Sequence, residues 1–133
     1  MIIDAKDHIL GRLSTHVVSA LKEGEEVTVI NADKAIIKGD PEEIKERYKE
    51  KYEAGSRDRG PFFPKSPDRI VKRTVKGMLP KNNEGREMLG NLTVYKGTPE
   101  NVDGGEQVDD ALVTSLKGAN FVRMEDVSAY LGA

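Results

Sequence analysis

The residues with the clearest chemical potential are basic, and they gather in one part of the chain. Residues 57 to 96 hold ten lysines and arginines against four acids, whereas the whole chain of 133 residues holds 21 and 23. Lysine and arginine bind phosphate oxygens, and arginine can do so through two parallel hydrogen bonds. This segregation predicts binding to a polyanion. The formal net charge of −2 for the whole chain conceals the segregation.

Four of these cations follow helical spacing between residues 66 and 80. Ser66, Pro67 and Asp68 are typical of a helix start, and Gly77 and Pro80 of a helix end. Side chains at i, i+3, i+4 and i+7 share one helix face, so the pattern predicts a basic face opposite an apolar one. The predicted basic face comprises Arg69, Lys72, Arg73 and Lys76, and the apolar face comprises Ile70, Val71, Thr74, Val75 and Met78.

The loops on both sides of this helix extend the positive charge. The preceding loop and the following loop contribute Arg57, Arg59, Lys65, Lys81 and Arg86. A merely solvated face is the alternative interpretation, but no acid stands four residues from Arg73 or Lys76 to neutralise them. Phe62 and Phe63 could stack on unpaired bases, although we expect them to anchor the loop to the core.

A second group of candidates lies near the N-terminus, where Asp4, Asp7 and His8 follow the first predicted strand. His16 comes eight residues after His8, which is not a zinc-binding spacing, so we expect capping and surface hydrogen bonding here and no metal or cofactor. Gly11 and the following arginine lack the lysine and multiple glycines of a phosphate-binding loop. An alternative interpretation is a small α/β nucleotide-using transferase, with its substrate near Asp4, Asp7 and Gly11.

The elements that position these residues indicate an α/β class. Residues 2–3 and the β-branched run 27–30 predict strands, and an apolar helical stripe from Leu10 to Leu21, capped by Asp7 and ended by Gly24, lies between them. A strand, a helix and a strand in this order imply parallel pairing.

Further along the chain, Asp40 and Pro41 start another helix, residues 35–37 form a short strand or a core turn, and residues 92–95 form a strand. A final helix runs from about residue 125 to 131, after a polar loop over 97–105. Length and composition predict a single domain over residues 1–133, with an acidic part from 97 to 133. The chain has no cysteine, no export signal and no 18-residue apolar run, which predicts a soluble protein without a membrane.

Five segments together resemble the ribosomal protein L13 (uL13) family of the large subunit in its archaeal form. They are Ile3-Asp4-Ala5-Lys6, Leu10-Gly11-Arg12-Leu13-Ser14, Val29-Ile30-Asn31-Ala32-Asp33, Thr74-Val75-Lys76-Gly77-Met78-Leu79-Pro80 and Leu92-Thr93-Val94-Tyr95-Lys96-Gly97. The resemblance implies a three-layer α/β/α fold with a mostly parallel sheet of about four strands, no catalytic activity, and a cytoplasmic, ribosomal location. It also implies binding to large-subunit rRNA during assembly, neighbouring ribosomal proteins as partners, and no homo-oligomer in the functional state. An mRNA-binding regulator is a further alternative, because it would use the same basic helix.

Two departures from the family pattern shape these expectations. The family usually places arginine before Gly77-Met78-Leu79-Pro80 and further basic residues after it, but this chain has Lys76 before that block and Asn82, Asn83 and Glu84 behind Lys81. We therefore expect the helix to carry more of the binding than the following loop. The sequence pI of about 5.8 is low for an rRNA-binding protein, and one hypothesis is a salt-rich cytosol, where counterion release contributes less to binding.

Overall fold

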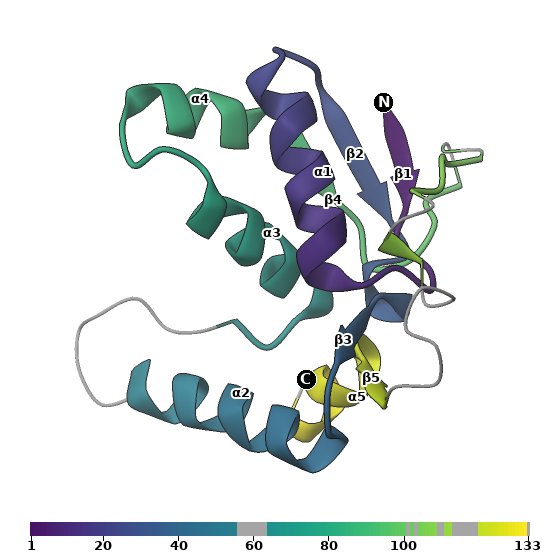
Figure 1. Cartoon of the computed structure of the whole chain (residues 1–133), viewed down its shortest axis with the longest axis vertical. Coiled ribbons are helices and arrows are strands. Elements are labelled where there is room, and N and C mark those ends of the chain that lie inside the picture. Colours follow the sequence, from purple (N-terminus) through teal and green to yellow (C-terminus); the bar gives the residue numbers. More distant parts are fainter. Residues whose placement is uncertain (56–63, 101, 103, 109–110, 113–119, 133) are drawn as a thin grey trace.

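The computed structural model describes residues 1–55, 64–100, 102, 104–108, 111–112 and 120–132. Strands β1 (Ile2–Asp4), β2 (Val27–Ile30) and β4 (Leu92–Val94) form a parallel sheet in the order β1-β2-β4. Helix α1 (Leu10–Lys22) connects β1 to β2, as the strand-helix-strand pattern predicted (Figure 1). The α/β class and the parallel sheet are confirmed.

The parallel sheet has three strands among the described residues, rather than the four or so implied by the resemblance. A single parallel bridge from Ile3 to Glu106 lies on the free edge of β1 and is the nearest equivalent of a further strand. Strands β3 (Ile36–Lys38) and β5 (Phe121–Arg123) form a separate antiparallel pair. Residues 35–37, predicted as either a strand or a turn, thus contribute mainly to a strand.

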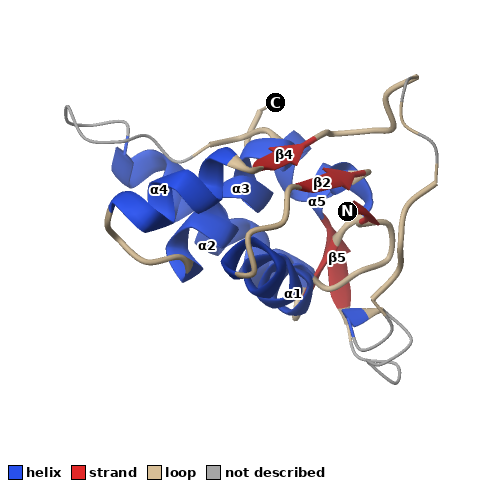
Figure 2. Ribbon diagram, turned by 90° about the horizontal axis from the view of Figure 1, so that it is seen from above, coloured by secondary structure: helices blue, strands red, loops and turns tan. Residues whose placement is uncertain are grey.

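The helices pack around these two sheets. Figure 2 shows α1, α3 (Pro67–Met78) and α4 (Asn83–Gly90) together on one side of the parallel sheet. Helices α2 (Pro41–Gly55) and α5 (Met124–Tyr130) lie beside the β3–β5 pair, and a 3₁₀ turn, η1 (Ala32–Lys34), joins β2 to β3. The final helix thus forms almost where the sequence placed it.

The core lies between the sheet and the helices on this side. The side chains of Ile3, Val27, Val29 and Leu92 are buried on one face of the sheet, whereas the alternate residues Thr28 and Thr93 are partly or fully exposed. Such alternation is expected where one face of a sheet meets the core, but Ile30, at the end of β2 and on the face of Thr28, is buried as well. Helix α1 adds Leu13, Val17 and Leu21 to the same cluster.

The helix ends were predicted with mixed success. Asp40 accepts hydrogen bonds from the backbone N–H groups of Glu42 (2.9 Å) and Glu43 (3.3 Å), so it caps α2 as expected. The predicted capping of α1 by Asp7 is wrong, because the helix begins only at Leu10 and Ile9 stands at its N-cap. Asp7 instead has a φ of 62°, and its carboxylate accepts a hydrogen bond from the side chain of Arg123.

Candidate nucleic-acid interface

Helix α3 has the two faces that its spacing predicted. The side chains of Arg69, Lys72, Arg73 and Lys76 are all exposed. On the opposite face, Ile70, Val71 and Val75 are at most 1% exposed and pack into the core. Met78 was wrongly assigned to the apolar face, because its side chain is 41% exposed, whereas the following Leu79 is buried in the core.

The basic face of α3 has little local neutralisation. Among the described residues, no carboxylate forms an ion pair with Arg69, Lys72 or Lys76. Asp68, an acid that stands four residues before Lys72 and that the sequence reasoning passed over, accepts a hydrogen bond from Ser66 Oγ instead. The surface of this helix therefore offers cations that a phosphate backbone could neutralise.

Arg73 lines three hollows beside α3 in the part of the chain that the structure describes. One of about 300 Å³ runs beside Arg69, Lys72, Arg73 and Lys76. A second, of about 360 Å³, extends from Arg73 and Lys76 to Lys81 and Arg86. A third, of about 400 Å³, lies toward α1, β3 and α2. Arg73 is consequently the point where the parts of this surface meet.

Arg86 was predicted to lie on a loop, but it lies on α4. Asn82 caps this helix by accepting a hydrogen bond from the backbone N–H of Gly85 at 3.1 Å. The corner between α3 and α4 is tight, because a Cβ atom on Gly85 would lie 1.7 Å from the carbonyl oxygen of Pro80. The cap residue Asn82 was the available signal, but the sequence reasoning took Asn82, Asn83 and Glu84 for loop residues. Lys81 lies in the turn itself, so this corner sets the positions of both flanking cations.

Of the three predicted cations before α3, only Lys65 lies within the described residues. The ammonium group of Lys65 lies 4.7 Å from the ring centroid of Tyr52 on α2, which draws it away from the basic face of α3. Arg57 and Arg59 lie outside the described residues, as do Phe62 and Phe63. Of the nine predicted binding residues, the structure brings six together around α3 and α4: Arg69, Lys72, Arg73, Lys76, Lys81 and Arg86.

Comparison with known proteins agrees with the sequence resemblance. The family model for ribosomal protein L13 matches residues 1–101 of the chain. The chain belongs to the ribosomal protein L13 family. The sheet, α1 and the whole of the α3–α4 surface fall within the matched part.

Archaeal relatives cover almost the entire length of this L13 family member. A protein of Archaeoglobus fulgidus named large ribosomal subunit protein uL13 is 48% identical over 98% of this chain and 86% of its own length. A protein of the same name from Natronomonas pharaonis is 43% identical over 100% of this chain and 91% of its own length. Another from Methanococcoides burtonii is 42% identical over 99% of this chain and 97% of its own length. The L13 family consists of structural ribosomal components rather than enzymes, so the transferase reading is not supported.

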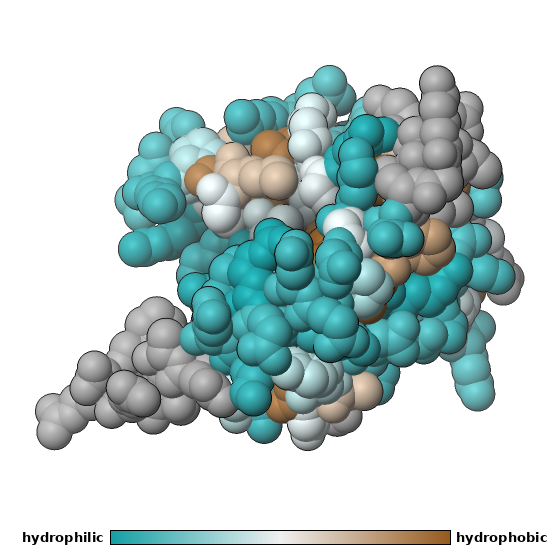
Figure 3. Space-filling view, turned by 60° about the horizontal axis from the view of Figure 1, so that its bottom comes forward, coloured by the Kyte–Doolittle hydropathy of each residue, from teal (hydrophilic) through white to brown (hydrophobic). Residues whose placement is uncertain are grey.

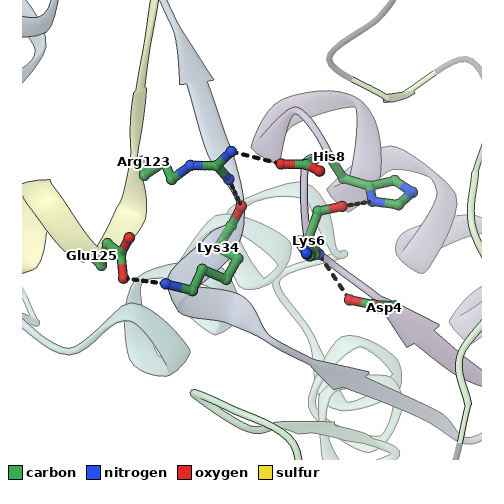
Figure 4. A network of polar contacts seen from close by, with 7 residues as sticks. Asp4, Lys6, His8, Lys34, Arg123 and Glu125 are labelled. Atoms are coloured by element: carbon green, nitrogen blue, oxygen red, sulfur yellow. Dashed lines mark hydrogen bonds and ion pairs between the residues drawn. The ribbon is translucent and has the colours of Figure 1, made fainter.

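Asp4 and Asp7, two of the three residues considered for that transferase site, form part of a structural network in this L13 chain. Figure 4 shows Arg123, on β5, donating to the carbonyl oxygen of Lys34 at 2.8 Å, and the same side chain donates to Asp7 at 2.7 Å. Asp4 accepts from the backbone N–H of Lys6 and from the side-chain amide of Asn31, each at 3.0 Å. Apart from the local bond from Lys6, these bonds are partly buried and join segments distant in the sequence, so the two carboxylates do more than form surface hydrogen bonds.

The network also contains a partly exposed ion pair that changes the pKa of its lysine. The ammonium group of Lys34 donates to Glu125 at 2.8 Å, and this bond raises the pKa of Lys34 above its usual value.

No group of three or more potential metal ligands occurs among the described residues. Within the same residues, no helix has the length and apolar character needed to cross a membrane.

Proposed function

We propose that this chain is a structural constituent of the large ribosomal subunit that binds large-subunit rRNA through α3 and its flanking cations. The observation that carries the proposal is the placement of Arg69, Lys72, Arg73 and Lys76 on one exposed face whose opposite face is core. The family and the names of its relatives supply the identity of the polyanion. Lys81 and Arg86 extend the contact around the corner to α4, and Arg57, Arg59 and Lys65 would complete it from the preceding segment.

The expected contacts are mainly with phosphates. Helix α3 is 12 residues long, about 18 Å at 1.5 Å per residue, so its four cations can follow several consecutive phosphates. Phosphate contacts orient a protein on its RNA but do not read the sequence. Specificity would therefore come from the folded shape of the rRNA and from unpaired nucleotides that reach the protein.

The proposal extends to the context in which the chain works. It acts as one L13-like domain in the cytoplasmic ribosome, supports assembly of the large subunit, and meets neighbouring ribosomal proteins rather than a second copy of itself. Residues 97 to 133 are acidic, with two bases and seven acids, so we expect them to contribute little to RNA binding.

The test is a double charge reversal, Arg73→Glu with Lys76→Glu. Both side chains are exposed, so the circular dichroism spectrum and the unfolding midpoint should stay close to those of the wild type. Binding to a transcript of Archaeoglobus fulgidus large-subunit rRNA, measured by filter retention, should weaken at least 100-fold, because two phosphate contacts become repulsive (roughly 3 kcal/mol or more). The matched control is Lys6→Glu with Lys22→Glu, which changes the net charge equally at exposed positions remote from the α3 hollows.

Equal binding by the two double variants would contradict the proposal, because only total charge would then matter. If the Arg73 and Lys76 double variant unfolds and the control variant does not, this face of α3 is not exposed to solvent. Sedimentation of the native protein in salt-washed lysate separates the ribosomal role from mRNA regulation, since the ribosomal role requires nearly all of it to travel with large subunits.

A further inference from the structure

The hollow on the α2 side of α3 combines an apolar wall with cationic side chains. It measures about 400 Å³ and lies between the start of α1, β3, α2 and α3. The buried side chains of Ile9, Leu10 and Tyr48 contribute to its wall, and Ile37 adds a partly buried one. This wall suits a ligand with an apolar face.

Three cations line the same hollow. They are Lys38 at the end of β3, Lys51 on α2 and Arg73 on α3, and no carboxylate is found among the described residues that line it. The Lys51 ammonium group lies 5.2 Å from the ring centroid of Tyr48, which keeps a positive charge beside the apolar wall. Burial raises the pKa of Tyr48, so its phenol is neutral at physiological pH. A ligand with an apolar face and negative charge complements this lining.

The hollow adjoins the proposed phosphate-binding face. Arg73 lines both the hollow and the groove beside Arg69, Lys72 and Lys76. Figure 3 shows that the surface on the α2 side is otherwise largely hydrophilic. A backbone that followed α3 would therefore pass the opening of this hollow with its phosphates already held.

Two glycines keep the hollow open. Gly11, in the first turn of α1, and Gly77, near the end of α3, both line it, and a Cβ atom on either would meet nothing within 4 Å. Neither glycine has a positive φ, so the backbone does not require glycine at these positions. A larger side chain would fit the helix and fill the hollow, which provides a direct test of its use.

We propose that this hollow receives a single unstacked nucleotide of the rRNA, with its base against Ile9, Leu10 and Tyr48 and its phosphates near Lys38, Lys51 and Arg73. The inference rests on the proposed function, which it deepens by naming the RNA feature that is recognised. The volume lies within the range of roughly 300–1,000 Å³ that small-ligand sites occupy. Proteins recognise RNA largely through such splayed bases, which bury an apolar face and leave their edges to polar groups.

The experiment compares three variants in binding to the same Archaeoglobus fulgidus large-subunit rRNA transcript. Gly11→Leu fills the hollow without removing a cation, and Gly11→Ala makes the same backbone change with little filling. Gly90→Leu, at the end of α4, places leucine at another glycine with open space around it and away from this hollow. All three changes raise helix propensity, so none should unfold the chain.

We expect Gly11→Leu to bind about tenfold more weakly, as when one base loses its stacking contacts. The salt dependence should not change, because the phosphate contacts remain, and Gly11→Ala and Gly90→Leu should bind like the wild type. Dimethyl sulfate probing should show one unpaired base that the wild type protects and that becomes reactive with Gly11→Leu, while the rest of the footprint persists.

Unchanged affinity and footprint for Gly11→Leu would overturn this inference but leave the proposed function standing, provided that the wild type binds. Failure of the wild type to bind rRNA would instead reject the proposed function itself. A further arm titrates AMP, CMP, GMP and UMP. Micromolar, saturable binding of a free nucleotide that Gly11→Leu abolishes, with rRNA binding unaffected, would show that the hollow serves a soluble ligand and would also overturn the inference.

Discussion

At the residue scale, His8 shows how a candidate for chemistry serves the fold. Its side chain is fully buried, and its Nε2 accepts a hydrogen bond from the backbone N–H of Val108 at 2.8 Å. Because Nε2 accepts, Nδ1 carries the hydrogen and donates it to the carbonyl oxygen of Lys6 at 2.9 Å. The neutral ring thus fastens the segment around Val108 beside the end of β1.

Replacement of this histidine should therefore be costly. His8→Ala leaves the partly buried N–H group of Val108 and carbonyl group of Lys6 without these bonds and opens a cavity, so we expect the free energy of unfolding to fall by about 2–4 kcal/mol. Urea denaturation followed by circular dichroism measures this loss. His16→Ala, at an exposed position on α1, is the control and should change stability by less than about 0.5 kcal/mol. Similar losses for the two variants would show that the bonds of His8 contribute nothing particular.

At the element scale, α2 and α3 begin with similar residues but are capped differently. Asp40 and Pro41 start α2, and Ser66 and Pro67 start α3. The Asp40 carboxylate accepts from two backbone N–H groups, whereas Ser66 makes no capping bond and its hydroxyl donates to Asp68. Sequence alone treats both as caps, and only the geometry distinguishes them.

This difference predicts unequal effects of two matched substitutions. Asp40→Ala should lower the free energy of unfolding by about 1 kcal/mol, the usual contribution of a side-chain cap. Ser66→Ala should lower it by less than about 0.5 kcal/mol, because no capping bond is lost. Thermal denaturation of both variants under one set of conditions measures the difference, and a larger loss at Ser66 would mean that α3 is capped by its side chain after all.

At the scale of the whole molecule, charge is segregated although the total is close to neutral. Residues 1 to 56 carry 9 bases and 12 acids, residues 57 to 96 carry 10 and 4, and the remainder carries 2 and 7. Around α3 and α4, the fold gathers six of the ten cations of the middle part onto one surface and adds Lys38 and Lys51 from the first part. An acidic protein can in this way present a basic face.

Such a face should give rRNA binding a strong dependence on salt. If about six phosphates are neutralised, the slope of log affinity against log salt concentration should be about −4 to −5, from coefficients of roughly 0.7 to 0.9 per contact. Filter binding over a series of KCl concentrations measures it. The Arg73→Glu and Lys76→Glu double variant should have a slope less negative by about 1.5, whereas a wild-type slope near zero would exclude a phosphate-based mechanism.

The sequence by itself determined the elements whose signals are local. The apolar stripe of α1, the β-branched run of β2 and the two faces of α3 follow from residue spacing, because a regular backbone places side chains at a fixed period. The four cations of α3 therefore share a face in any fold that buries Ile70, Val71 and Val75. Helix α4 was missed because its eight residues carry little periodicity, although Asn82 signalled its start.

Only the tertiary structure decided which distant residues meet. Asp7 finds Arg123 rather than the start of α1, and Lys38, Lys51 and Arg73 converge on one hollow from three separate elements. These contacts depend on how the helices pack on the two sheets, and that packing is the joint result of many buried side chains rather than of any one segment. Local spacing thus placed the cations of α3 on one face, and packing determined the pocket beside them and the network that joins the two ends of the chain.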